Sequence, residues 1–126
     1  MAFTGIRRAA ALLDGAGLLL FTAIGIAMHG AGFGPGPILR NVVPILGGWY
    51  LLAPLTRVYA RVSWSTLLLH WILAVPAGVL VRQLWVGRLV TRATVVFLVA
   101  SLVFTLVLLA AGRLILWLRQ RRATAG

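Results

Sequence analysis

Residues 93–118 read ATVVFLVASLVFTLVLLAAGRLILWL, an apolar run with one charged side chain, Arg113. A helix rises about 1.5 Å per residue, so a run of this length exceeds the ~30 Å thickness of the hydrocarbon layer of a bilayer. A long stretch of this kind with almost no charge is typical of a transmembrane helix. The rest of the chain can therefore be compared with the pattern of a membrane protein.

Three further apolar stretches precede this run, at about 9–28, 38–55 and 64–81, and each is long enough to cross a bilayer. The segment 29–37 separates the first two, because its glycines and two prolines favour a loop. We find no internal repeat. The sequence predicts an all-α fold, a polytopic membrane protein with a four-helix transmembrane bundle that forms a single domain over residues 1–126.

The composition indicates the same class of protein. Hydrophobic residues make up 62% of the chain, and the mean hydropathy is +1.05. Twelve arginines, no lysine and one acidic residue, Asp14, give a net charge of +11. Such a charge is typical of nucleic-acid-binding proteins, but this chain has too little polar surface to enclose its apolar side chains in water. We therefore expect the lipid bilayer and its anionic lipids as partners, and no nucleic acid.

The arginines lie at the ends of the predicted spans and indicate an orientation. If the N-terminus is cytoplasmic, seven arginines fall on the cytoplasmic side and four on the outer side. The positive-inside rule then predicts a multi-pass protein of the inner (plasma) membrane with both termini cytoplasmic. The cytoplasmic set is Arg7, Arg8, Arg57, Arg61, Arg119, Arg121 and Arg122, and the outer set is Arg40, Arg82, Arg88 and Arg92.

Three ionisable residues, Asp14, His70 and Arg113, fall inside the spans. A charge in hydrocarbon costs a few kcal/mol or more unless it is paired or hydrated. Counted along the helices, the three lie at similar depth, so we expect an ion pair between Asp14 and Arg113 with His70 within reach. This polar cluster can lock the helices in register or relay protons, and Arg113 can instead extend toward the inner head groups. We expect the lock, because three leucines on the same faces would close a path to the outer side: Leu18, Leu98 and Leu108.

A second group of basic residues gathers at the outer ends of the spans. Such a group suits an anion or an acidic lipid head group, although basic residues at span ends more often simply contact the membrane interface. Its members are His29, Arg40, Arg82, Arg88 and Arg92.

Small residues predict where helices approach each other, because they let backbones pack closely in lipid. On the first helix they share an inward stripe with Asp14, and Ile26 falls on the lipid-facing side. The predicted helix-packing positions are Gly15, Gly25, Gly47, Gly48 and Gly112.

The sequence carries no enzyme signature. One carboxylate does not support paired-acid catalysis, the absence of cysteine excludes thiolate chemistry, and two distant histidines argue against a metal site. We expect a non-enzymatic protein without cofactor or metal. Two functions remain open: a structural or accessory subunit that packs with other membrane proteins, which is favoured, and a small oligomeric transporter or channel-like protein for protons or a small anion. A homo-oligomer is compatible with both.

Short patterns recur in order on all four spans: Asp14 followed by Phe21, Gly25 and His29–Gly30; Pro44 to Trp49; Pro76 to Arg82; and Gly112–Arg113. With these patterns the chain resembles, nearly end to end, a family of small prokaryotic four-helix membrane proteins known as domain of unknown function 3054. It departs from the family pattern where Gly112 and Arg113 are adjacent, with no aromatic residue between them, and where Ile26 stands in place of a polar or basic residue. The resemblance implies an integral membrane protein and no particular chemistry.

Overall fold

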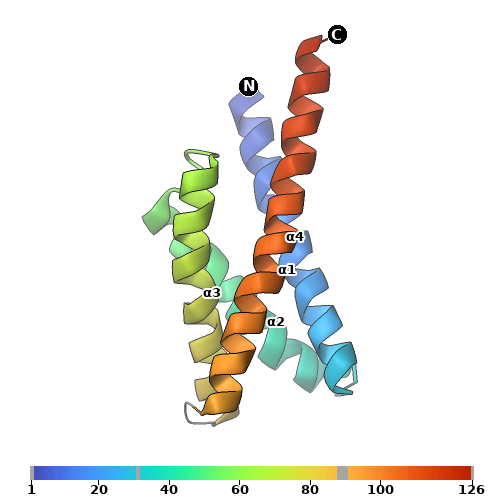
Figure 1. Cartoon of the computed structure of the whole chain (residues 1–126), viewed down its shortest axis with the longest axis vertical. Helices are drawn as coiled ribbons and strands as arrows, with labels where there is room; N and C mark the ends of the chain where they lie inside the picture. Colours follow the sequence, from blue (N-terminus) through green and yellow to red (C-terminus); the bar gives the residue numbers. More distant parts are fainter. Residues whose placement is uncertain (1, 31, 88–90, 126) are drawn as a thin grey trace.

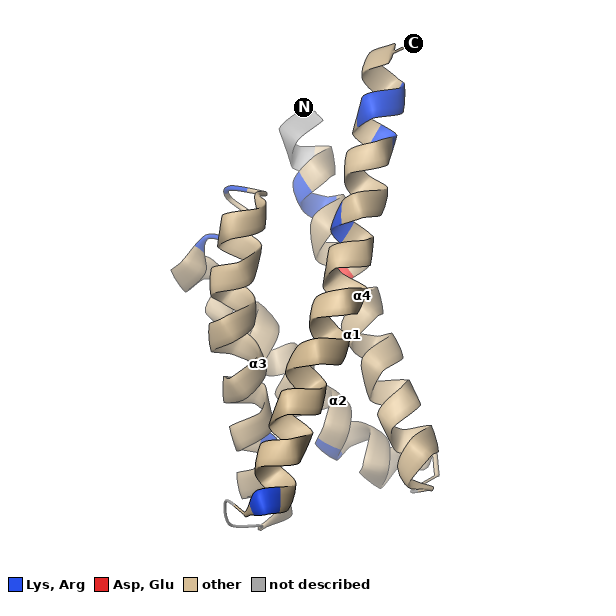
Figure 2. Cartoon of the chain, viewed as in Figure 1, with Lys and Arg blue, Asp and Glu red and all other residues tan. Residues whose placement is uncertain are grey.

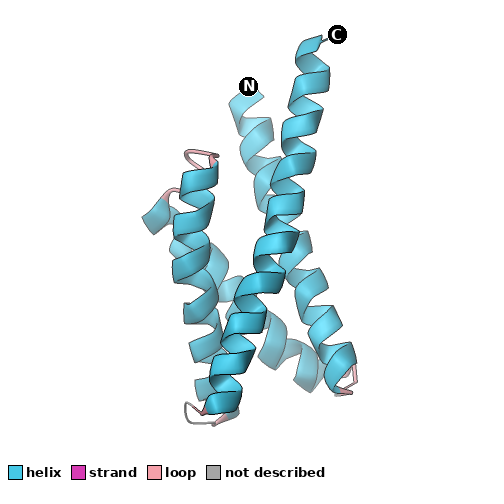
Figure 3. Cartoon of the chain, in the orientation of Figure 1, coloured by secondary structure: helices cyan, strands magenta, loops and turns pink. Residues whose placement is uncertain are grey.

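The computed structural model describes residues 2–30, 32–87 and 91–125, with side chains from residue 5 onward. Each of its four helices is long and apolar enough to cross a membrane. This confirms the predicted all-α fold with four helices of transmembrane length. The helices are α1 (Ala2–His29), α2 (Pro35–Thr56), α3 (Trp64–Val86) and α4 (Arg92–Ala125) (Figures 1 and 3).

The helices extend beyond the predicted spans, because hydropathy marks the apolar part of a helix whereas backbone caps mark its ends. α1 ends at His29 and α2 begins at Pro35, so the prediction that the whole of residues 29–37 forms a loop is wrong for its first residue and its last three. Proline is tolerated in the first turn because the amide hydrogen that it lacks would have no partner there. α2 ends where Arg57 takes a left-handed conformation with φ 58°, and α3 ends before Gly87 with φ 74°.

The loop between α2 and α3, residues 57–63, packs into the bundle. Val58 is fully buried, and the Tyr59 side chain is partly buried. At the end of the loop the Ser63 hydroxyl accepts a hydrogen bond from the Thr66 amide, and the Thr66 hydroxyl accepts one from the Ser63 amide. This capping box defines the start of α3 and therefore the end of the loop that carries Tyr59.

Consecutive helices run antiparallel, so both chain ends and the α2–α3 loop lie at one end of the bundle, which we call the terminal end (Figure 1). The α1–α2 and α3–α4 connections lie at the opposite end, which we call the loop end. Each helix packs against its two neighbours in the cycle α1–α2–α3–α4–α1. An even number of antiparallel helices places both termini on the same side of a membrane, and it leaves open which side that is.

Apart from Arg113, the described arginines gather toward the two ends of the bundle, and the helix surfaces between them are largely apolar (Figure 2). Leu12 and Leu51, for example, are 74% and 79% exposed. Such a surface is unfavourable in water and matches the hydrocarbon of a bilayer. The distribution fits a multi-pass membrane protein.

α2 and α3 approach each other closely at Gly48 and Gly78. A Cβ added to Gly48 would lie 3.3 Å from the Gly78 Cα, and one added to Gly78 would lie 3.0 Å from the Pro44 carbonyl oxygen. Gly78 is absent from the predicted packing positions, although it is the most crowded glycine against a neighbouring backbone. The other two predicted glycines that lie at helix contacts are Gly15, which faces Tyr50, and Gly112, which faces Leu13.

Two predicted packing glycines, Gly25 and Gly47, lie at no close contact. A Cβ added at either position would meet no atom within 4 Å, so neither glycine lies at a helix crossing within the described part of the chain. Sequence spacing marks small residues but not the points where helices cross, and only a crossing point needs a small residue. Ile26 is also misplaced by the prediction, since it is buried with 4% exposure. The inward row of α1 follows every fourth residue from Asp14 and therefore includes Ile26.

Candidate functional site

The single acidic residue, Asp14 on α1, forms a two-point ion pair with Arg113 on α4. Asp14 is fully buried, and Arg113 is 6% exposed. Arg113 Nη1 donates to Asp14 Oδ1 and Nη2 donates to Oδ2, each at 3.1 Å. Nη1 also donates to the Ala10 carbonyl oxygen at 3.4 Å. The two charges neutralise each other inside the bundle, as charged groups at membrane depth require. The structure thus brings together the two residues whose pairing we expected from their depth.

A tyrosine from the α2–α3 loop completes this ion pair. The Tyr59 hydroxyl donates to Asp14 Oδ2 at 2.7 Å and accepts from Trp49 Nε1 at 2.7 Å. Burial, and then the negative charge of Asp14, raise the pKa of Tyr59 above its ordinary value, so the phenol keeps the proton that it donates. The Arg113 guanidinium carbon lies 5.9 Å from the centroid of the Tyr59 ring. One carboxylate therefore ties α1, α4 and the α2–α3 loop together.

His70 on α3 is fully buried, but its hydrogen bonds go to α2 rather than to the ion pair. Its Nε2 donates to the Trp49 carbonyl oxygen at 2.9 Å, because a carbonyl oxygen can only accept. In a neutral ring Nδ1 then accepts from the Thr56 hydroxyl, 2.8 Å away. The expected direct approach of His70 to the pair is therefore replaced by an indirect link through Trp49 and Tyr59. We call the six residues the central polar network: Asp14, Thr56, Tyr59, Trp49, His70 and Arg113.

Apolar side chains separate the central polar network from the loop end. On α1, Leu18 lies one turn beyond Asp14 and is fully buried, and Thr22 follows one turn later. Leu18 belongs to a buried core that includes Leu67 and Leu109. The inward row of α1 is therefore interrupted by a leucine at the point where a polar path would have to continue.

The hydroxyls of α4 do not supply a detour around Leu18. Ser101 and Thr105 are buried, and each donates to a carbonyl oxygen of its own helix. Of the other two leucines expected to close the path, Leu98 packs against the core and Leu108 lies against Gly17 of α1. This arrangement favours the lock over the relay.

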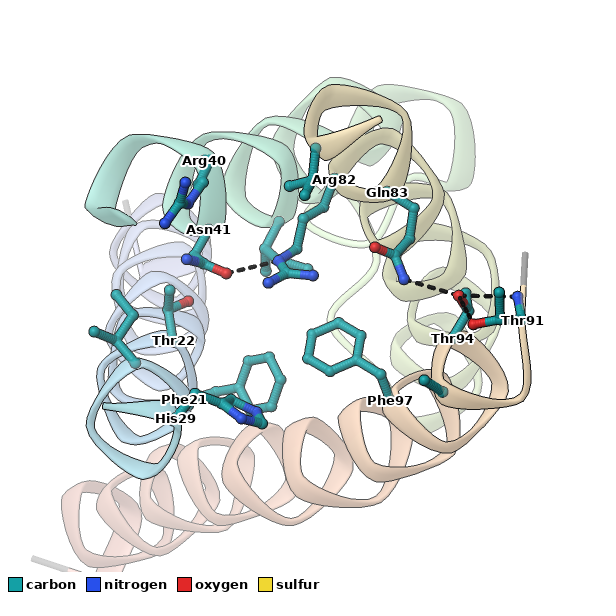
Figure 4. A pocket seen from close by; sticks show the side chains of 15 residues that line it. Phe21, Thr22, His29, Arg40, Asn41, Arg82, Gln83, Thr91, Thr94 and Phe97 are labelled. Atoms are coloured by element: carbon teal, nitrogen blue, oxygen red, sulfur yellow. Dashed lines mark hydrogen bonds between the residues drawn. The ribbon is translucent and has the colours of Figure 1, made fainter. Parts of the chain in front are cut away.

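A cavity of about 410 Å³ lies between the helices at the loop end (Figure 4). Three members of the predicted outer basic group line it: His29, Arg40 and Arg82. His29 and Arg40 are exposed, so the cavity reaches the surface of the bundle. We call it the basic cavity. Asn41, Gln83, Thr94 and Phe97 are among the other residues that line it.

Arg82 extends from α3 toward the middle of the basic cavity (Figure 4). Its Nε donates to Asn41 Oδ1 of α2 at 2.6 Å. Its guanidinium carbon lies 4.7 Å from the centroid of the Phe97 ring of α4, which is a cation–π distance. Contacts to two helices thus hold the charge of Arg82 in a defined place.

Gln83, the next residue on α3, places an unused acceptor beside this charge. The side chain is 7% exposed, and its Nε2 donates to Thr94 Oγ1 at 3.0 Å. Its Oε1 is buried and finds no hydrogen-bond donor within the described parts of the chain. Figure 4 shows this oxygen turned toward the interior of the cavity, while the amide nitrogen points to Thr94. A buried carbonyl oxygen without a donor costs about 1–3 kcal/mol, which makes the position a candidate for ligand contact.

The predicted outer basic group is divided by the structure. Arg92 is exposed at the start of α4 and is not part of the cavity lining. Arg88 lies outside the described residues. The basic charge of the cavity therefore comes from His29, Arg40 and Arg82.

A second hollow, of about 970 Å³, opens at the terminal end between α1, α4 and the α2–α3 loop. Arg7, Arg61 and Arg113 contribute to its wall together with Trp64 and Trp117. We call it the terminal groove. It shares no lining residue with the basic cavity, so the ion pair borders the terminal groove alone.

Sequence analysis missed several residues that build these sites, among them Trp49, Tyr59 and Gln83. The sequence could have indicated Gln83, because an uncharged amide near the end of a transmembrane helix commonly hydrogen-bonds to a neighbouring helix. The predicted third span stopped at residue 81 and left it out. Tyr59 carried no signal, because a tyrosine in a loop at the membrane interface is ordinary.

No part of the described chain suggests a metal centre, since no three side chains of His, Cys, Asp or Glu come together there. Comparison with protein families matches residues 11–116 to a family described as protein of unknown function (DUF3054). No curated protein and no solved structure matches the chain. The family match covers more than four fifths of the sequence and includes most of each of the four helices. The chain therefore belongs to the DUF3054 family of proteins of unknown function.

Proposed function

We propose that this protein is a non-enzymatic structural or accessory subunit of the inner membrane that packs with other membrane proteins or with further copies of itself. One observation carries the proposal. The only carboxylate side chain of the sequence, Asp14, is fully buried, bonded to Arg113 and Tyr59, and followed on its helix by the buried Leu18. A proton carrier needs a titrating group that is reached from both sides of the membrane. The position of Asp14 favours a fixed role instead.

The contacts of Asp14 support a lock. Through them the N-terminal half of α1, the C-terminal half of α4 and the α2–α3 loop share a single charge centre. Separation of any of these segments would strand a buried charge, which is costly in hydrocarbon. A bundle held in this way presents constant outer faces to a partner.

The experiment is to solubilise the protein in mild detergent and to measure its mass and its co-purifying membrane proteins. We expect a particle that contains more than one chain, either of this protein or of a defined partner. Recovery of a lone monomer at several detergent concentrations would contradict the proposal. Proton flux into liposomes provides the second readout. Flux that Asp14→Asn abolishes while the bundle stays folded would favour the relay.

A small-anion transporter is the second candidate, and the two hollows favour it. The basic cavity faces the loop end, the terminal groove faces the terminal end, and arginines line both. A closed core between two such sites is compatible with alternating access. Anion uptake into liposomes, reduced by Arg40→Gln and unchanged by Arg92→Gln, would favour transport. Absence of uptake would leave the accessory role.

We further propose that the terminal end is cytoplasmic. Seven described arginines lie toward that end outside the ion pair: Arg7, Arg8, Arg57, Arg61, Arg119, Arg121 and Arg122. This bias supports the orientation by the positive-inside rule.

A further inference from the structure

The basic cavity carries positive charge that no acidic side chain of the chain can balance. Arg40 and Arg82 both line the cavity, and the exposed His29 lies on its lining as well. The only acidic side chain in the sequence, Asp14, pairs with Arg113 outside this cavity. Positive charge concentrated in a partly enclosed site attracts anions strongly, because water screens it less there than on an open surface.

The arrangement around Arg82 is suited to an oxyanion. Its Nε donates to Asn41, and its guanidinium carbon lies over the Phe97 ring. These two contacts fix the direction of the guanidinium, and a fixed planar fork binds phosphate or carboxylate oxygens with little further loss of freedom. Arg40 comes from the neighbouring helix and adds a second positive charge to the same cavity.

Gln83 provides an independent observation and points to a second property of the ligand. Its buried Oε1 faces the cavity and lacks a donor within the described chain (Figure 4). A carbonyl oxygen accepts only, so the ligand must donate a hydrogen bond at this place. A protonated amine would be repelled by the arginines, whereas a hydroxyl donates without adding positive charge.

We propose that the basic cavity binds a phosphate group that carries a neighbouring hydroxyl, as in phosphoglycerol. The phosphate lies against Arg40 and Arg82, and the hydroxyl donates to Gln83 Oε1. The volume of about 410 Å³ holds a group of this size and falls in the usual range for small-ligand sites. The inference goes beyond the accessory role proposed above and does not depend on it.

Two sources supply this chemistry, a soluble glycerol phosphate and the head group of an anionic phospholipid. The exposed Arg40 and His29 show that the cavity reaches the surface of the bundle. Either source presents a phosphate oxygen and a hydroxyl a few bonds apart. The experiment must therefore separate them.

The test is a calorimetric titration of the whole protein in phosphatidylcholine nanodiscs with glycerol 3-phosphate and, as a matched ligand without hydroxyls, propyl phosphate. We expect glycerol 3-phosphate to bind about tenfold or more tightly, since a hydrogen bond to an otherwise unused buried acceptor is gained. Gln83→Leu should remove this preference and leave propyl phosphate binding in place. If both soluble ligands bind the natural sequence and do so with equal affinity, the inference is overturned.

Charge variants test the phosphate contact. Arg40→Gln should weaken binding of both ligands about 10- to 100-fold, because a charge-assisted contact is lost. Arg92→Gln is the matched control: Arg92 is exposed at the same end and does not line the cavity, so binding should not change. Equal weakening by both substitutions would mean that only the general charge of the loop end attracts the ligand, and the site would be refuted. Arg40 is exposed, so this pair remains informative if Gln83→Leu fails to fold.

The lipid arm uses nanodiscs that contain phosphatidylglycerol, and mass spectrometry counts the lipids that remain bound to the protein after delipidation. Retention of phosphatidylglycerol that Arg40→Gln reduces and Arg92→Gln does not, together with no binding of soluble glycerol 3-phosphate, identifies the lipid as the source. Binding of the soluble ligand in phosphatidylcholine alone identifies the free compound. Binding of neither overturns the inference, and the accessory role, which is measured by particle mass, stands or falls separately.

Discussion

Asp14→Asn, Arg113→Leu and the double replacement test whether the ion pair locks the bundle. The pair contains two charge-assisted hydrogen bonds of 3.1 Å, and each such bond contributes about 1.5–3 kcal/mol. Either single replacement should therefore lower the free energy of unfolding by about 3–5 kcal/mol, because the remaining charge stays buried without its counter-ion. The double replacement should cost less than either single one, since no charge is then stranded.

The assay is unfolding of each variant in the same detergent, followed by tryptophan fluorescence. Arg119→Leu is the matched control on α4: Arg119 is exposed, and its replacement should change the free energy of unfolding by less than about 0.5 kcal/mol. If the costs of the two single replacements simply add in the double variant, the two sites are not coupled and the reasoning is refuted.

Three further predictions concern packing, the Tyr59 contact and orientation. Gly78→Ala should destabilise the protein by about 1–3 kcal/mol, because the new Cβ would lie 3.0 Å from the Pro44 carbonyl oxygen. Gly47→Ala, whose Cβ would meet no atom within 4 Å, should be neutral or stabilising by up to ~1 kcal/mol. Equal effects of the two substitutions in the same unfolding assay would count against a close α2–α3 crossing at Gly78. Tyr59→Phe should cost about 1–3 kcal/mol, since the buried Trp49 Nε1 loses its acceptor and Asp14 loses a donor, and a loss below about 0.5 kcal/mol would show that the hydroxyl is dispensable. A reporter that is active only outside the cytoplasm should work in the α1–α2 loop and fail in the α2–α3 loop, and the reverse pattern would refute the proposed orientation.

The pairing of Asp14 with Arg113 was accessible before the structure, and the role of Tyr59 was not. A chain with one acidic residue offers one carboxylate partner to a buried arginine, so matched depth along two antiparallel helices is sufficient to name the pair. Tyr59 reaches Asp14 from a loop 45 positions away. Nothing in the hydropathy of the loop indicates that direction, because it depends on how the loop packs against the helices.

The sequence by itself determined the number of helices, their approximate extent and the lipid environment that surrounds them. Uninterrupted apolar stretches such as residues 93–118 form helices in a bilayer, because a helix satisfies its own backbone hydrogen bonds. Tertiary structure decided which faces meet. In lipid the outer faces of the helices are as apolar as the inner ones, so the hydrophobic pattern does not specify the rotation of a helix about its axis or the points where helices cross. For that reason Gly78 rather than Gly47 lies at a crossing, Ile26 points inward, and Arg82 and Gln83 share a cavity with Arg40 while Arg92 stays outside it.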